Sequence, residues 1–212
     1  MIMDYELYPE ITACFTGHRA IARELLPALR FRLEAELRRA YGAGYRCFLC
    51  GGALGFDTLA AQAVLSLRAE LPDLRLIMIL PCRDQDRFWS AREQQIYRQI
   101  LAEADDCRVL ADRYFAGCMQ SRNRFLVDHA SLCICYFLHP RGGTFQTVRY
   151  AFSEDLTIVN LAFLPESGGA ALKEDAWNYT SISPSADKNA DTATLRLLRD
   201  GRSTSGPMRR RF

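Results

Sequence analysis

Two short apolar runs that each end in a glycine-rich turn place the strongest constraint on the fold of this chain. The first, Cys47–Cys50, leads through the turn Gly51–Asp57 into a segment with helical spacing. The second, Leu132–Leu138, leads through the turn His139–Thr144 into another segment with apolar spacing. A strand, a glycine turn and a helix N-terminus in this order favour anion binding, because glycine lets a phosphate approach and the free N–H groups attract its charge.

The first turn alone also fits a purely structural interpretation, since glycines at strand–helix junctions are common in α/β domains. Asp57 stands where an N-cap belongs, so it either caps the helix or contacts a ligand. The second turn favours the ligand interpretation, because parallel strands end together at the edge where open α/β sheets bind ligands. We therefore expect one nucleotide or phosphosugar to lie between residues 51–57 and 141–147.

Apolar runs of strand length alternate with segments of helical spacing through most of the chain. The expected strands cover residues 11–16, 47–50, 74–80, 107–110, 132–138 and 157–161, and the expected helices cover about 21–40, 57–71, 90–104, 118–130 and 145–152. This alternation predicts an α/β fold, a three-layer α/β/α sandwich with a mainly parallel sheet and right-handed crossovers.

The composition changes near residue 165, where glycine, serine, alanine and threonine begin to dominate. We expect residues 1–164 to form one nucleotide-binding domain and residues 165–212 to form a poorly ordered C-terminal extension. Trp177 and Tyr179 could pin part of that extension to the domain, and residues 194–199 could form a short helix.

The charge balance and the cysteines limit the class of protein. Lysine and arginine number 27 against 25 acidic residues, which disfavours a nucleic-acid partner. There is no apolar run of about 18 residues, so no membrane span is expected. Cys47 and Cys50 imitate half of a zinc site, but they would point to opposite faces of a strand, so no metal is expected. Eight cysteines in a chain without a basic leader predict a cytoplasmic protein.

Four motifs together resemble the YpsA-like branch of the SLOG superfamily: Phe15–Arg19, Gly51–Asp57, Met119–Arg124 and Arg141–Thr144. The superfamily also includes the "lonely guy" phosphoribohydrolases, the DNA-processing protein DprA and molybdenum-cofactor carrier proteins. The resemblance covers about residues 11–163. It implies a Rossmann-like sheet with a pocket for a nucleotide, an NAD- or ADP-ribose-like molecule or another phosphosugar, with no certain cofactor. Relatives with this fold often form dimers, so it also implies a homodimer.

The residues and the resemblance together predict a ligand-binding set made of glycine-loop backbone, hydroxyl and amide groups and arginines. Arginine suits phosphate because its guanidinium gives paired charge-assisted hydrogen bonds, and Arg122 matches the arginine that the phosphoribohydrolases keep near their glycosidic bond. Two alternatives stay open: Arg124 as an exposed helix arginine, and His18 as a helix cap. The predicted set is Gly17, His18, Arg19, Gly51, Gly52, Ala53, Gly55, Asp57, Arg122, Arg124, Arg141, Gly142, Gly143, Thr144, Gln146 and Thr147.

The favoured function is binding or sensing of a nucleotide derivative without efficient catalysis. The resemblance places the two glutamates of the phosphoribohydrolase motif at Gln146 and Thr147, which cannot exchange a proton at neutral pH. The first alternative is an N-glycosidic hydrolase in which Asp57 or Asp128 replaces those acids. The second is DprA-like binding of single-stranded DNA. No catalytic residue is assigned.

Overall fold

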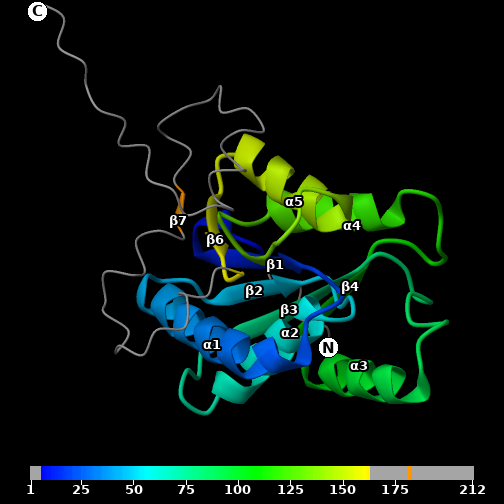
Figure 1. The fold of residues 1–212 in the computed structure, drawn as a ribbon, viewed down its shortest axis with the longest axis horizontal. Coiled ribbons are helices and arrows are strands. Elements are labelled where there is room, and N and C mark those ends of the chain that lie inside the picture. Colours follow the sequence, from blue (N-terminus) through cyan, green and yellow to red (C-terminus); the bar gives the residue numbers. More distant parts are fainter. Residues whose placement is uncertain (1–5, 163–180, 183–212) are drawn as a thin grey trace, which may run out of the picture.

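The computed structural model describes residues 6–162 and 181–182, which form strands and helices in alternation (Figure 1). The strands are β1 (Thr12–Gly17), β2 (Cys47–Cys50), β3 (Arg75–Leu80), β4 (Asp106–Val109), β5 (Leu132–Tyr136), β6 (Thr157–Asn160) and β7 (Ser181–Ile182). The helices are α1 (Leu26–Gly42), α2 (Phe56–Leu67), α3 (Ala91–Glu103), α4 (Cys118–Asp128) and α5 (Gly142–Ser153), with short 3₁₀ turns η1 (Pro9–Ile11) and η2 (Arg23–Leu25).

All seven strands form one sheet in the order β4-β3-β2-β1-β5-β6-β7. Strands β1 to β6 are parallel, which confirms the predicted fold class. Strand β7 runs antiparallel to β6, with Ser181 opposite Val159. These two residues are the only part of the predicted extension within the described residues; Trp177, Tyr179 and 194–199 lie outside them.

Helices α1, α2 and α3 cover one face of the sheet, and α4 and α5 cover the other (Figure 1). Alternating residues of β1 supply the two cores: Phe15 packs with α1 and α2, whereas Cys14 packs with α4 and α5. Cys47 and Cys50 likewise belong to opposite cores, as their spacing predicts. Strands buried on both faces explain the near-continuous apolar runs in the sequence.

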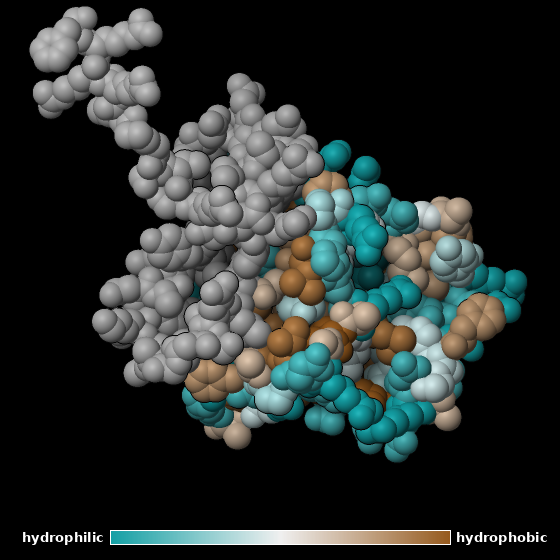
Figure 2. Space-filling model, viewed as in Figure 1, coloured by the Kyte–Doolittle hydropathy of each residue, from teal (hydrophilic) through white to brown (hydrophobic). Residues whose placement is uncertain are grey.

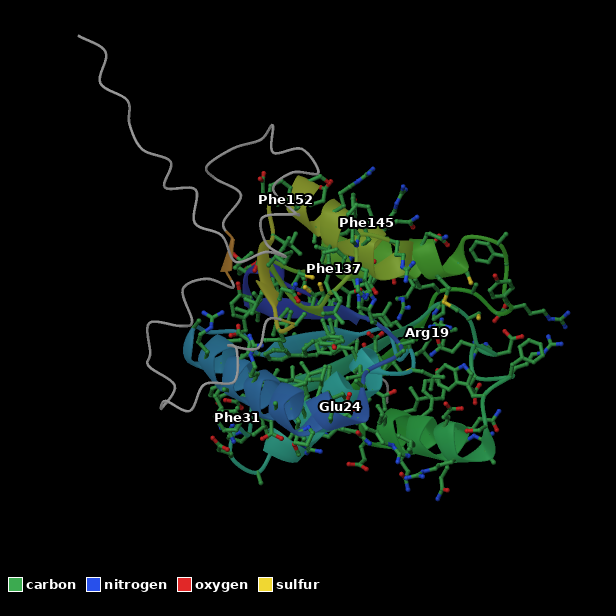
Figure 3. All side chains as sticks on the ribbon, viewed as in Figure 1. Arg19, Glu24, Phe31, Phe137, Phe145 and Phe152 are labelled. Carbon is green, nitrogen blue, oxygen red and sulfur yellow. The ribbon has the colours of Figure 1, made fainter. Side chains whose placement is uncertain are left out.

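Two helices begin at other residues than predicted. Helix α1 begins at Leu26 rather than Ile21, because Arg23–Leu25 forms a 3₁₀ turn and Pro27 fits only the first helical turn. Helix α5 begins at Gly142 rather than Phe145, so both glycines of the second turn belong to its N-terminus. Phe145 then packs against Phe137 with ring centres 6.1 Å apart (Figure 3).

The strand order reverses beside β1. Strands β2, β3 and β4 extend the sheet on one side of β1, and β5 and β6 extend it on the other. The carboxyl ends of β1 and β5 therefore lie next to each other with their following segments diverging, which is where doubly wound sheets leave a crevice.

The surface in the view of Figure 2 alternates between hydrophilic and smaller hydrophobic patches. In the part of the chain that the structure describes, no helix combines the length and the apolar character that a membrane crossing requires.

Candidate functional site

A cavity of about 320 Å³ lies at the carboxyl ends of β1 and β5, and we call it the switch-point cavity. The end of β1, the first glycine loop, helix α4 and the start of α5 all contribute to its wall. The ten predicted residues that line it are Gly17, His18, Arg19, Ala53, Asp57, Arg122, Arg141, Gly142, Gly143 and Thr144. Four further residues were not predicted: Phe15, Thr16, Met119 and Asn123.

A buried ion pair forms the floor of this cavity. The Asp57 carboxylate lies 3.5 Å from Nη1 of Arg122, and each side chain is only 6% exposed. The same carboxylate accepts a hydrogen bond from the Ala53 N–H at 3.2 Å. Burial raises the pKa of Asp57, while Arg122 and the Ala53 N–H oppose that rise. Within the described residues the buried Nε of Arg122 has no hydrogen-bond partner, so the guanidinium keeps a donor that its protein neighbours do not satisfy.

The sequence places Asp57 where an N-cap of the second helix is expected, but in the structure Asp57 is not the N-cap of α2. Gly55 is the N-cap, with a φ of 81°, and Asp57 is the second residue of the helix. Its side chain turns back to the Ala53 N–H instead of serving the first helical turn. Asp57 thus closes the first glycine loop and presents a carboxylate to the cavity.

The predicted glycines of the first loop do not line the cavity. Instead, other groups of the protein lie close to the positions that their side chains would take. A Cβ on Gly51 would lie 1.3 Å from Arg122 Nη1, so the guanidinium occupies the space of the missing side chain. A Cβ on Gly55 would lie 2.2 Å from the Arg19 carbonyl oxygen. One on Gly52 would lie 3.0–3.1 Å from Met78, Gln85 and Tyr97.

His18 connects the two glycine loops. Its ring Nε2 accepts hydrogen bonds from the N–H groups of Leu138 at 2.9 Å and His139 at 3.4 Å. Its backbone carbonyl accepts from the Phe56 N–H at 3.2 Å. Burial lowers the pKa of His18, and His139 and Arg141 lower it further. The helix-cap alternative is therefore wrong, because the His18 ring binds backbone N–H groups of the segment before α5. To accept these bonds at Nε2, the imidazole must be neutral.

The start of α5 is open to the cavity. Its N-cap, Arg141, makes no side-chain capping bond, so the first helical N–H groups keep their capacity for an anion. A Cβ on Gly143 would meet no atom closer than Asn123 Nδ2 at 3.9 Å. The exposed Arg19 and Arg141 side chains add positive charge at the rim, and Figure 3 shows Arg19 beside the end of β1.

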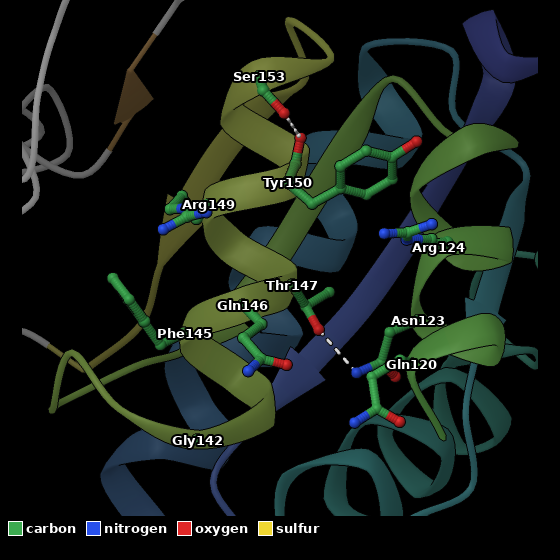
Figure 4. Close-up of a pocket in the computed structure, with 10 residues that line it drawn as sticks. All are labelled: Gln120, Asn123, Arg124, Gly142, Phe145, Gln146, Thr147, Arg149, Tyr150 and Ser153. Atoms are coloured by element: carbon green, nitrogen blue, oxygen red, sulfur yellow. Dashed lines mark hydrogen bonds between the residues drawn. The ribbon is translucent and has the colours of Figure 1, made fainter. Parts of the chain in front are cut away.

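Three other predicted residues, Arg124, Gln146 and Thr147, line a different hollow of about 530 Å³, which we call the α4–α5 groove (Figure 4). Thr147 is buried, and its hydroxyl is engaged by Asn123 Nδ2 at 2.7 Å and by the Gly143 carbonyl at 2.9 Å. The Arg124 guanidinium lies over the Tyr150 ring, 5.8 Å from its centre.

The sequence contained a partial signal for the four lining residues that were not predicted. Phe15, Thr16, Met119 and Asn123 all belong to the motifs that carry the family resemblance. Their contribution depends on the meeting of β1 with α4, which no local pattern encodes. Asp128, the other acid considered for catalysis, is exposed, accepts a hydrogen bond from the Tyr150 hydroxyl at 2.7 Å and does not line the cavity.

A family model supports this reading of the motifs. The model YpsA, described as the YspA SLOG family, matches residues 16–153. The chain belongs to the YspA SLOG family. This family member is 28% identical to the uncharacterized SPbeta prophage-derived protein YoqJ of Bacillus subtilis over 116 residues, which cover 49% of this chain and 68% of YoqJ. It is 32% identical to the UPF0398 protein YpsA of Bacillus subtilis over 103 residues, which cover 48% of this chain and 55% of that relative.

Two solved structures share the fold of this YspA SLOG family member. DprA from Streptococcus pneumoniae matches with a TM-score of 0.52 and 18% identity, over 78% of this chain and 52% of that one. DprA from Helicobacter pylori, in a study of its single-stranded DNA binding mode, matches with a TM-score of 0.55 and 18% identity, over 91% of this chain and 74% of that one. Identities this low establish the fold alone.

Proposed function

We propose that this chain binds a nucleotide or nucleotide-sugar derivative, of the NAD or ADP-ribose type, in the switch-point cavity and without efficient catalysis. One observation carries the proposal: the buried guanidinium of Arg122 lies in the same cavity as the uncapped start of α5. Both groups favour an anion. Asp57 beside them suits sugar hydroxyls, which donate hydrogen bonds to a carboxylate.

The size of the cavity supports a small ligand portion. A volume of about 320 Å³ is near the lower end of the range for small-molecule sites. Such a space suits a phosphosugar or a mononucleotide better than a complete dinucleotide. The eight free cysteines support a cytoplasmic location for this binding, because a reducing compartment keeps thiols unpaired.

The acids of the cavity support binding over hydrolysis. Neither Gln146 nor Thr147, at the positions of the phosphoribohydrolase glutamates, lines the cavity. Asp57 is the one carboxylate among the described residues that line it. Its Oδ2 is engaged by the Ala53 N–H and by Arg122, whose positive charge favours the ionised carboxylate as a hydrogen-bond acceptor over its use as a proton acceptor. A catalytic base needs access to the attacking water, and losing general base action costs about 10²–10⁴-fold in rate.

N-glycosidic hydrolysis remains the second candidate because Asp57 has a raised pKa inside the cavity. The assay is release of free base from a panel of nucleoside monophosphates. We expect none above the uncatalysed background. Turnover on the order of 1 s⁻¹ that disappears in Asp57→Asn would establish the hydrolase instead.

Single-stranded DNA binding has less support from the site. Stacking platforms for single strands use exposed aromatic rings, whereas the aromatic residues of this cavity are the fully buried Phe15 and the half-buried His18.

The test of the proposal is native mass spectrometry of the freshly purified full chain, alone and with added AMP, ADP-ribose or a short single-stranded oligonucleotide. We expect added mass from a nucleotide derivative, either co-purified or supplied, and none from the oligonucleotide. The same spectrum reports whether the chain is a homodimer. Mass added only by the oligonucleotide would overturn the proposal.

A further inference from the structure

The α4–α5 groove adjoins the switch-point cavity directly. Asn123 and Gly142 line both hollows, so the start of α5 is the wall between them. The groove, at about 530 Å³, is the larger of the two. A ligand that lies across Gly142 can therefore reach both spaces at once.

The inner wall of the groove is held in place by bonds inside the protein. Asn123 donates to Thr147, which donates to the Gly143 carbonyl. The Tyr150 hydroxyl donates to Asp128 at 2.7 Å, which fixes the ring beneath Arg124. These contacts satisfy the side-chain hydroxyls of Thr147 and Tyr150 within the protein, so we expect ligand contacts among the other polar side chains of the groove.

Three polar side chains at the opening have no such role. Gln120 and Arg124 of α4 and Gln146 of α5 are exposed, and none has a hydrogen bond or ion pair with another described residue. Figure 4 shows Gln120 and Arg124 on one side of the groove and Gln146 on the other. Two amides and a guanidinium suit a heterocycle, because amides both donate and accept hydrogen bonds, and a guanidinium that already lies over the Tyr150 ring presents a flat face for stacking.

We infer that the α4–α5 groove is a second subsite, and that the ligand is a two-part molecule joined by a diphosphate that crosses the start of α5. Its phosphosugar lies in the switch-point cavity beside Asp57 and Arg122, and its base-bearing half lies in the groove between Gln120, Arg124 and Gln146. This inference rests on the proposed function and adds to it the place of the base-bearing half of the ligand, which is the α4–α5 groove.

The experiment compares a two-part probe with its sugar half. Isothermal titration calorimetry measures ADP-ribose and ribose 5-phosphate against the full chain and against the variants Arg124→Ala and Gln146→Ala. We expect ADP-ribose to bind the wild type at least tenfold more tightly than ribose 5-phosphate. Each variant should lose about tenfold or more for ADP-ribose and less than about twofold for ribose 5-phosphate, because that half does not reach the groove.

Arg98→Ala is the matched control. Arg98 is an exposed arginine of α3, on the opposite face of the sheet, so its loss changes the net charge equally without touching either hollow. Its affinities should equal those of the wild type. Equal affinity of the wild type for both probes, or variants that bind ADP-ribose normally, would overturn the second subsite and leave the proposed function standing. If neither probe binds the wild type, the proposed function itself fails.

Discussion

The two glycine loops look alike in sequence but differ in what surrounds their glycines in the structure. Gly51 and Gly55 of the first loop leave space that other parts of the protein occupy, the Arg122 guanidinium and the Arg19 carbonyl. Gly142 and Gly143 of the second loop have no close neighbour at the place of a Cβ, and both line the switch-point cavity. The first loop thus makes room for other groups of the protein, whereas the second leaves open surface at the cavity, where we propose that the ligand binds.

This difference shows that a glycine-rich turn has two physical explanations that can be distinguished by what a side chain would meet. A clash with protein atoms indicates packing, and open space at a helix N-terminus indicates room for a ligand. The arginine that the first loop accommodates lines the same cavity as the start of α5, so Arg122 and the second loop face one common space. The comparison predicts that changes in the first loop affect stability and changes in the second affect binding.

The largest effect is expected for Gly55→Ala. Its Cβ would collide with the backbone of Arg19, and its φ of 81° disfavours any side chain. We expect a loss of roughly 2–5 kcal/mol in the free energy of unfolding, measured by urea denaturation. Gly44→Ala is the control, because Gly44 also has a positive φ, of 101°, but no atom within 4 Å of its Cβ position. If both variants lose the same free energy, crowding by Arg19 is not part of the cause.

A smaller loss, about 1–3 kcal/mol, is expected for Gly51→Ala. The new methyl group would displace the end of Arg122 and leave the buried Asp57 without its cation. A double-mutant cycle sharpens this prediction: in an Arg122→Ala background, Gly51→Ala should cost less than about 0.5 kcal/mol. Strictly additive losses would mean that Gly51 does not make room for Arg122.

The smallest effect concerns pH. The pKa of His18 is lowered in the folded state, so the unfolded chain binds more protons between that pKa and the ordinary value of about 6.5. The contribution of His18 to stability is therefore complete above about pH 6.5 and declines as the pH falls below it. His139 and Arg141 face the same ring and oppose its protonation.

The check is urea denaturation of the wild type and His18→Gln at several pH values from about 7.5 to about 5.5. Glutamine keeps an acceptor for the Leu138 N–H but cannot take up a proton, so the variant should show a weaker decline in the free energy of unfolding. Equal declines would assign the effect to another group.

Much of the fold was predictable because buried parallel strands and amphipathic helices leave clear periodic patterns. Both loops, the parallel sheet and most of the cavity lining follow from strand–turn–helix units and the family motifs, whereas the strand order that creates the switch point was not predicted. The neighbours of individual side chains were not predictable. Arg122 meets Gly51 and Asp57 from a distant helix, and Gln146 lies in the α4–α5 groove because α5 starts at Gly142. Such contacts arise when elements far apart in the sequence pack together, and the local spacing of residues does not encode them.

The most direct test of the central claim is calorimetric titration of ADP-ribose into the wild type and Gly143→Val. A valine there adds bulk to open space at the start of α5, and no positive φ opposes it. We predict binding to the wild type with a dissociation constant on the order of micromolar, a loss of at least about tenfold in the variant, and the same midpoint of urea denaturation for both proteins. Equal affinity in the two proteins would contradict the claim that the second glycine loop holds the ligand.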